Sequence, residues 1–265
     1  MGWANQLNTS IVAAVVSGGL VGFMLGLLGG GGSILATPLL LYVVGVAQPH
    51  VAIGTGALAV SINAFANLAS HATKGRIWWR CALVFAAIGS IGAFAGSSLG
   101  KAMDGSALLF LFGILMIVIA TLMLRGQKAA QAVARPVDTK MCLTTTAVAL
   151  VSGVASGFFG IGGGFLIVPG LMAAAGMPMI SAVGSSLLAV GAFGLATSIN
   201  YAMSGLVDWT LAAQFISGGV AGGVLGMLLA TRLAAYKNVL NRIFSILIYA
   251  VAAYILYKSS SAFRV

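Results

Sequence analysis

Two glycine-rich segments carry the clearest chemical signal in the sequence. GLLGGGGS occupies residues 26–33, and GFFGIGGG occupies residues 157–164. Because glycine permits a positive φ, each segment predicts a broken helix, in which one helix stops and another starts with its amide groups exposed. Such a helix start attracts anions through its partial positive charge and its N–H donors. The residues predicted to contact an anion there are Gly29, Gly30, Gly31, Gly32, Ser33, Gly160, Gly162, Gly163 and Gly164.

Helix packing is the alternative explanation for glycines. It suits the pairs at four-residue spacing, such as Gly22 with Gly26 and Gly153 with Gly157. Consecutive glycines exceed what a packing face needs, which favours a site at the two breaks. The first segment is not a phosphate loop of the Walker type, because the closing Lys-Ser/Thr is absent.

Polar residues follow in the next apolar segment of each half. Asn63, Asn67 and His71 are four residues apart, so they share one helical face. A polar face toward lipid is costly, so this face must turn toward other helices or a transport pathway. Hydrogen bonds between helices and contact with a ligand both explain it. The residues assigned to substrate binding are Thr55, Asn63, Asn67, Ser185 and Ser186.

Acidic residues are nearly absent. The chain has no Glu, and Asp104, Asp138 and Asp208 all lie in predicted loops. This pattern argues against an enzyme, a metal-cation site and a carboxylate proton relay. We predict no catalytic residue, no metal ligand and no cofactor, and we expect an anion or a neutral solute as cargo. A proton or a sodium ion remains open as coupling ion, with His71 considered for proton coupling ahead of His50.

The elements that position these residues are membrane helices. Of the 265 residues, 60% are hydrophobic and only 6% are charged, so the lipid bilayer must be the main solvent. A membrane-spanning helix takes about 20 apolar residues. Segments near that length lie at 11–28, 51–70, 81–100, 107–124, 142–159, 179–200, 211–231 and 239–257. Two shorter apolar pieces lie at 34–47 and 165–177, at equivalent places in the two halves.

The chain contains an internal duplication. GFMLGLLGGGGSILATP at 22–38 matches GVASGFFGIGGGFLIVP at 153–169, and AIGTGALAV at 52–60 matches AVGSSLLAV at 182–190. We therefore expect an all-α integral membrane protein made of two homologous repeats with four to five transmembrane helices each. The predicted division is a first repeat at 1–124, a basic linker at 125–141 and a second repeat at 142–265.

Basic residues predict how the repeats are oriented, because cytoplasmic loops carry the excess of Lys and Arg. If each half crosses five times, ten of the 13 basic residues fall on the side of the linker. If the short pieces only re-enter, nine of the 13 fall there. We expect inverted repeats, a cytoplasmic linker and both termini in the periplasm. The net charge of +10 is explained by these loops, and no nucleic-acid partner is expected.

The sequence resembles the TauE/SafE family, also called the 4-toluene sulfonate uptake permease family. The likeness rests on the repeated glycine-rich segment, on HVAIGT from His50, on AVGSS from Ala182 and on the glycine-spaced fourth span. It covers both halves. The resemblance implies a multi-pass transporter of the bacterial inner membrane for sulfite, sulfonates and related organosulfur anions. It also implies about eight spans, whereas five crossings in each half would make ten.

The leading hypothesis is a secondary transporter of small anions that works by alternating access. A passive anion channel would share the glycine breaks but would show a continuous polar pore and no counterflow. A membrane anchor or assembly subunit without cargo would use its glycines only for packing. The expected partners are the small anion and the lipid bilayer, and a homo-oligomer remains open.

Overall fold

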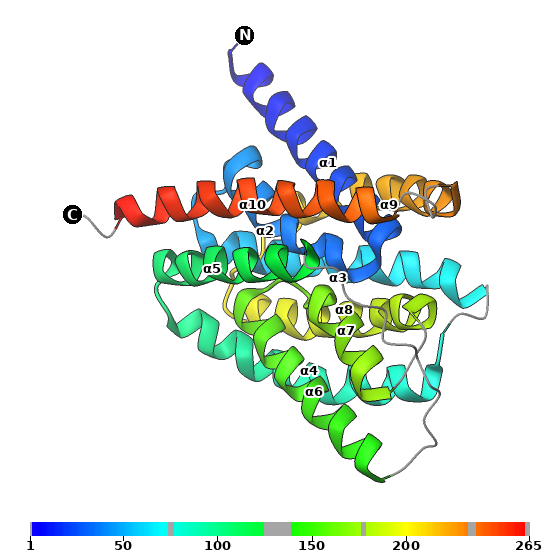
Figure 1. The fold of residues 1–265 in the computed structure, drawn as a ribbon. Helices are drawn as coiled ribbons and strands as arrows, with labels where there is room; N and C mark the ends of the chain where they lie inside the picture. Colours follow the sequence, from blue (N-terminus) through cyan, green and yellow to red (C-terminus); the bar gives the residue numbers. More distant parts are fainter. Residues whose placement is uncertain (1, 74–76, 125–138, 176–178, 233–236, 263–265) are drawn as a thin grey trace.

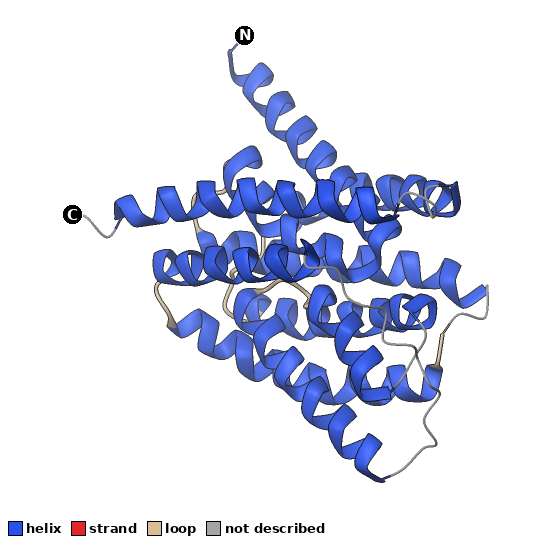
Figure 2. Cartoon of the chain, viewed as in Figure 1, coloured by secondary structure: helices blue, strands red, loops and turns tan. Residues whose placement is uncertain are grey.

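The computed structural model describes residues 2–73, 77–124, 139–175, 179–232 and 237–262. These residues form helices joined by short loops, with no strand among them (Figure 2). In chain order the elements are α1 (Gly2–Leu28), η1 (Gly29–Leu35), α2 (Ala36–Leu39), η2 (Leu40–Val44), α3 (Pro49–Thr73), α4 (Trp79–Ala102), α5 (Gly105–Leu124), α6 (Thr139–Phe159), α7 (Gly164–Ala175), α8 (Met179–Ala202), α9 (Trp209–Arg232) and α10 (Lys237–Ala262).

The long helices agree with the predicted membrane spans. Seven of the described helices are long and apolar enough to cross a bilayer, namely α1, α3, α4, α5, α8, α9 and α10. The eighth expected span falls in α6, of which residues 144–159 form a shorter apolar stretch. Large apolar side chains stay exposed, such as Ile91 at 70% and Val151 at 69% of their surface, as expected for side chains that face lipid. The prediction of an all-helical, multi-pass membrane protein is confirmed.

The two short apolar pieces fold differently. In the first half, η1 is a 3-10 helix that passes through the short α2 into the π-helical turn η2. This stretch contains Pro38, which lacks the N–H of a regular α-helix. It ends at Gly45, whose φ is 87°. In the second half, α7 is a regular α-helix of 12 residues.

The first helix of each half packs against a helix of the other half. Helix α1 packs along α9, and α6, which corresponds to α1, packs along α4, which corresponds to α9. Helix α3 meets α8, and α5 runs beside α10 (Figure 1). One apolar core contains buried residues of both halves, from Val21 to Ile255. The predicted division into 1–124 and 142–265 therefore describes the two repeats of the sequence. In the structure, both repeats contribute side chains to one common core. The linker lies mostly outside the described residues.

Glycines allow close packing of α1 on α9 and of α6 on α4. A methyl group on Gly22 would overlap the carbonyl oxygen of Gly219 in α9. At the corresponding place, a methyl group on Gly153 would overlap the carbonyl oxygen of Gly89 in α4. Small residues let membrane helices approach until their backbones touch. The glycines at four-residue spacing therefore serve packing.

Helices α3 and α8 cross at positions that correspond in the duplicated sequence. Ser61 of α3 donates a hydrogen bond to the carbonyl oxygen of Gly191 in α8, at 2.6 Å. The start of each helix lies near the end of the other, as shown by the hydrogen bonds of Thr55 with Asp208 and of Ser185 with Trp78. The two helices therefore run in opposite directions. This arrangement supports inverted repeats, which stay a prediction with respect to the membrane.

Candidate functional site

The two glycine-rich segments meet in the interior. An ideal Cβ on Gly30 would lie 2.5 Å from the Cα of Gly164 and 2.8 Å from the Cγ2 of Val190. Both glycines are buried. Ser33 is buried as well, and its Oγ donates to the carbonyl oxygen of Gly30 at 2.8 Å. The fold thus brings together the first and second segments that the sequence predicted as one site.

Both breaks begin with a glycine in the left-handed region. Gly29 has a φ of 74° and the corresponding Gly160 has a φ of 66°. Each of them lies against the first turns of a helix from the opposite half, Gly29 against Val183 and Gly160 against Ile53. An L side chain would be strained at these φ values and would also collide with the neighbouring side chain. The chain can make both breaks only with glycine at these positions.

Beyond these two glycines the halves differ. Gly162 and Gly163 also have positive φ, at 69° and 65°, and α7 then begins at Gly164. Gly31 and Gly32, which correspond to them, lie within the 3-10 helix η1 and do not have positive φ. A Cβ on Gly31 would meet open space, since no heavy atom lies within 4 Å of it.

The expected start of a second helix is therefore clear only in the second half. There the amides of Leu166 and Ile167 both donate to the carbonyl oxygen of Gly163, at 2.9 and 3.1 Å. Among the backbone hydrogen bonds of the described residues outside helices, none has the amide of Gly162 or Gly163 as its donor. In the first half, η1 is a 3-10 helix, in which amides bond to carbonyl oxygens three residues earlier in the chain. Fewer amides are therefore exposed at the first break than the sequence predicted.

The hydroxyls of Thr55 and Ser185 accept hydrogen bonds from backbone amides at the starts of two other helices. The amide of Asp208, just before α9, donates to Thr55 Oγ1 at 3.0 Å. The amide of Trp78, just before α4, donates to Ser185 Oγ at 3.2 Å. Both side chains therefore satisfy an amide at the start of a helix, where the chain itself offers no acceptor. Ser186, the neighbour of Ser185, donates to the carbonyl oxygen of Val183 at 2.8 Å.

Asn63 and Asn67 face the glycine stripe of α9. The amide of Asn63 lies against Gly219, and that of Asn67 lies against Gly223. Asn67 Nδ2 donates to the carbonyl oxygen of Asn63 at 2.9 Å. Within the described part of the chain, neither Nδ2 nor Oδ1 of the fully buried Asn63 has a hydrogen-bond partner. Asn63 thus lies at the contact of α3 with α9.

Sequence reasoning missed a polar cluster that joins α4 to α8. Lys101 Nζ donates to Asn200 Oδ1 at 2.7 Å and to Ser204 Oγ at 2.8 Å. Asn200 Nδ2 lies 2.6 Å from Ser97 Oγ and 2.8 Å from Ser98 Oγ, and donates to both. The available signal was that Lys101 and Asn200 both lie near the ends of apolar spans, where long basic side chains reach polar partners.

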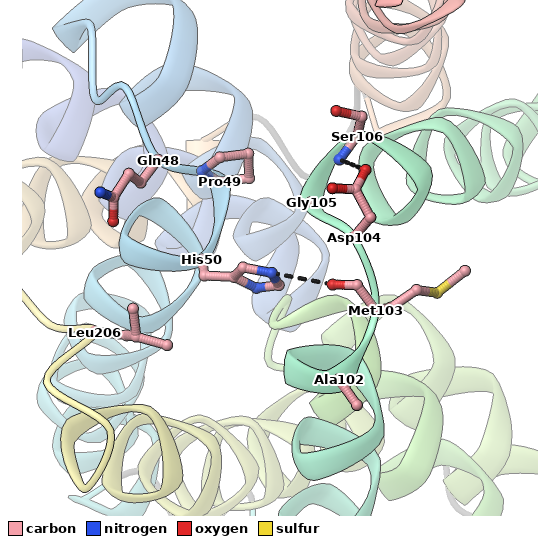
Figure 3. Close-up of a pocket in the computed structure, with 9 residues that line it drawn as sticks. All are labelled: Gln48, Pro49, His50, Ala102, Met103, Asp104, Gly105, Ser106 and Leu206. Atoms are coloured by element: carbon pink, nitrogen blue, oxygen red, sulfur yellow. Dashed lines mark hydrogen bonds between the residues drawn. The ribbon is translucent and has the colours of Figure 1, made fainter. Parts of the chain in front are cut away.

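A surface hollow of about 480 Å³ lies beside the start of α3 (Figure 3). His50 Nε2 points across it and donates to the carbonyl oxygen of Met103, at 3.2 Å. Asp104 accepts hydrogen bonds from the amides of Ala107 and Ser106, which hold the pKa of its carboxyl below the usual range. None of the glycines of the two breaks lines this hollow. It is therefore separate from the predicted anion site.

Metal-binding side chains do not gather in the described residues, where no group of three His, Cys, Asp or Glu lies close enough to hold an ion. Two buried hydroxyls lie in the first glycine-rich segment and in the short helix that follows it: Ser33 bonds to Gly30, and Thr37 has no partner within the described residues. A free hydroxyl or backbone amide can donate a hydrogen bond to an oxyanion without adding charge to the membrane interior.

Comparisons with known proteins agree with this reading. A model of the family "Sulfite exporter TauE/SafE" matches residues 14–255. A protein of Xylella fastidiosa (strain Temecula1), named as a probable membrane transporter protein, is 60% identical over 251 residues, which cover 94% of this chain and 96% of that protein. The probable membrane transporter protein YunE of Bacillus subtilis is 29% identical over 238 residues, covering 82% of this chain and 87% of YunE. No solved structure matches significantly.

The family match spans most of the chain, including both glycine-rich segments and the helices that carry Thr55, Asn63 and Ser185. The match covers 96% of the Xylella fastidiosa protein and 87% of YunE. The prediction of a membrane transporter, not an enzyme, is therefore confirmed. The chain belongs to the sulfite exporter TauE/SafE family.

Proposed function

We propose that the chain is a secondary transporter that carries small anions across the bacterial inner membrane by alternating access. Sulfite, sulfonates and related organosulfur anions are the proposed cargo, in keeping with the family's description as sulfite exporters. The observation that carries the proposal is the pair of helix breaks at Gly29 and Gly160. They correspond in sequence, meet in the interior and differ in backbone conformation.

The difference between the breaks supports alternating access. Gly31 lies in a 3-10 helix, whereas Gly162 has a φ of 69°, although the two occupy corresponding positions. In transporters made of inverted repeats, access alternates when one repeat or bundle rocks against the other around a fixed site. An exchange of the two break conformations between the halves would therefore turn the site toward the opposite side. The open space beside Gly31 leaves room for this change.

The residues around the breaks support an anion as cargo. Backbone amides suit an oxyanion, and so does the buried hydroxyl of Thr37, which has no hydrogen-bond partner within the described residues. The acidic residues of the chain are three, and Asp104 and Asp208 lie just before α5 and α9, outside the spans. An anion at the breaks would therefore meet no carboxylate from the apolar segments of the sequence.

The orientation proposed for the chain has a cytoplasmic linker and periplasmic termini. It rests on the excess of Lys and Arg on the linker side and can be tested with single cysteines at Ala72 and Met203, in a background without Cys81 and Cys142. The end of α3 and the exposed Met203 should be labelled from opposite sides, Ala72→Cys from the cytoplasm. Labelling of both from the same side would contradict the inverted arrangement.

The experiment that tests the function is counterflow in proteoliposomes. Vesicles preloaded with sulfite should accumulate a labelled sulfonate or sulfite from outside when the purified chain is present. Counterflow requires a carrier, so uptake that never exceeds equilibrium would favour a channel. If sulfite, thiosulfate, sulfoacetate, taurine, sulfate and simple carboxylates neither exchange nor raise the melting temperature of the protein, the anchor or assembly subunit would be the better interpretation.

A further inference from the structure

Asn63 is a buried amide without a structural partner. Its side chain is 0% exposed, and neither its donor nor its acceptor makes a hydrogen bond within the described residues. A buried amide that makes no hydrogen bond is destabilising, and native proteins leave few of them. The position therefore calls for an explanation other than stability.

The corresponding position in the other half shows that the packing does not need an amide. There Phe193 of α8 inserts its ring against Gly89 of α4, just as Asn63 of α3 lies against Gly219 of α9. Phe193 also stacks on Phe85, with ring centroids 6.1 Å apart. An apolar side chain thus packs against the glycine at the corresponding position of the other half. The helix contact therefore does not require the donor and the acceptor of the Asn63 side chain.

The contact of α3 with α9 is also the less firmly held of the two corresponding contacts. Helix α8 packs more extensively on α4 than α3 does on α9. Ser97 and Ser98 of α4 receive hydrogen bonds from Asn200 of α8. The corresponding residues of α9 are Met227 and Leu228, whose side chains offer no such bonds. Parting α3 from α9 would uncover Asn63.

We infer that Asn63 determines which cargo the transporter selects, by offering a donor and an acceptor together when α3 parts from α9. This inference rests on the proposed function. A carboxamide has an NH₂ group that donates and an oxygen that accepts. A cargo that pairs with both needs an acceptor and a donor on neighbouring groups. Sulfonates that carry a hydroxyl or an amino group, and protonated oxyanions such as hydrogen sulfite, meet this requirement.

Anions that have only hydrogen-bond acceptors can pair with the NH₂ group of Asn63 but not with its oxygen. They would leave the oxygen of Asn63 without a donor, and a site built to hydrogen-bond a hydroxyl rejects the analogue that lacks it. Ethanesulfonate and 2-hydroxyethanesulfonate form a matched pair of probes, because they carry the same charge and differ by one hydroxyl. We expect the wild-type protein to bind the hydroxyl compound about tenfold tighter or more.

The test compares binding of the two probes to the purified protein and to two variants. Asn63→Leu should lose the preference for the hydroxyl compound while its melting temperature stays the same or rises, because an unpaired amide is removed. Asn200→Leu is the control, since that amide is hydrogen-bonded to Ser97 and Ser98 and lies away from α9. It should lower the melting temperature and keep the preference. Asn63→Ala provides a second variant should the leucine not fold.

The outcomes separate this inference from the function on which it rests. Equal binding of the two probes by the wild-type protein would overturn the role of Asn63 and leave anion transport intact. A preference that survives in both Asn63→Leu and Asn63→Ala would overturn it as well. If neither sulfonate binds and neither is exchanged in vesicles, the proposed function fails first, and the inference falls with it.

Discussion

Gly30 and Gly164 lie in direct backbone contact where the two glycine-rich segments meet. A Cβ on Gly30 would lie 2.5 Å from the Cα of Gly164, and a Cβ on Gly164 would overlap the carbonyl oxygen of Gly30. No side chain can separate the two breaks, so the backbone of one break lies directly against the backbone of the other. This contact makes the two segments one structural unit.

Gly164→Ala should destabilise the protein. The added methyl group meets the backbone of Gly30, which cannot move aside as a flexible side chain can, and overpacking of this kind costs about 1–3 kcal/mol. The melting temperature of the purified protein in detergent measures the effect. Gly31→Ala is the control, because the added methyl group enters open space. Equal melting temperatures for the two variants would contradict the contact.

If the two glycine breaks exchange their backbone conformations during transport, alanine should have different effects at the corresponding positions Gly162 and Gly31. Gly162→Ala should lower stability directly, because alanine at a φ of 69° is strained by about 1–2 kcal/mol. Gly31→Ala should leave stability unchanged yet slow counterflow by about tenfold, because the strain would arise only in the opposite-facing state. Unchanged counterflow in a well-folded Gly31→Ala protein would argue against the exchange.

Two neighbouring glycines of α1 should respond differently to alanine. A methyl group on Gly22 overlaps the carbonyl oxygen of Gly219, whereas one on Gly19 would lie an ordinary 3.5 Å from the carbonyl oxygen of Gly218. Gly22→Ala should therefore weaken the contact of α1 with α9 by about 1–3 kcal/mol, and Gly19→Ala should not. Melting temperature and yield from membranes report the difference. A tolerated Gly22→Ala would mean that the helices lie further apart.

Thr55 and Ser185 should contribute to stability to a similar extent. Thr55→Val and Ser185→Ala each remove the acceptor for an amide at the start of a helix, which costs about 0.5–2 kcal/mol. Thr55→Ser keeps the hydroxyl and should keep the stability. Thermal unfolding measured beside anion binding separates the two roles of these residues. Weaker binding at an unchanged melting temperature would show that they contact the cargo instead.

Asp104 should make stability depend on acidic pH. The amides of Ala107 and Ser106 lower the pKa of its carboxyl from the ordinary value of 3.8, because they bond to the charged form. The folded state therefore binds the proton less readily than the unfolded state. Its contribution is complete above pH 3.8 and disappears as the pH falls through the lowered pKa. Asp104→Asn keeps an acceptor at the start of α5 without the titration, so melting curves recorded down this range should lose part of their pH dependence.

The sequence alone determined the membrane, the spans and the pairing of the glycine-rich segments. Apolar runs of about 20 residues can only be buried in lipid as helices, so composition and length decide this part. The duplication, read from Gly22 and Gly153 onward, also indicated which elements correspond. These features are local in the chain, or repeat along it, and need no knowledge of contacts.

Only the tertiary structure decided what the polar residues of those helices do. The sequence predicts cargo contacts for Thr55 and Ser185, whereas the structure shows their hydrogen bonds to the starts of helices more than 100 residues away in the chain. The antiparallel crossing of α3 and α8 brings those ends together. Asn63 and Phe193 correspond in sequence, and only the packing shows that they fill the same notch, one with an unpaired amide and one with a ring. A hydroxyl or an amide has the same appearance in a sequence whether it is satisfied or not. Its partners are set by contacts between distant segments, which the fold alone provides.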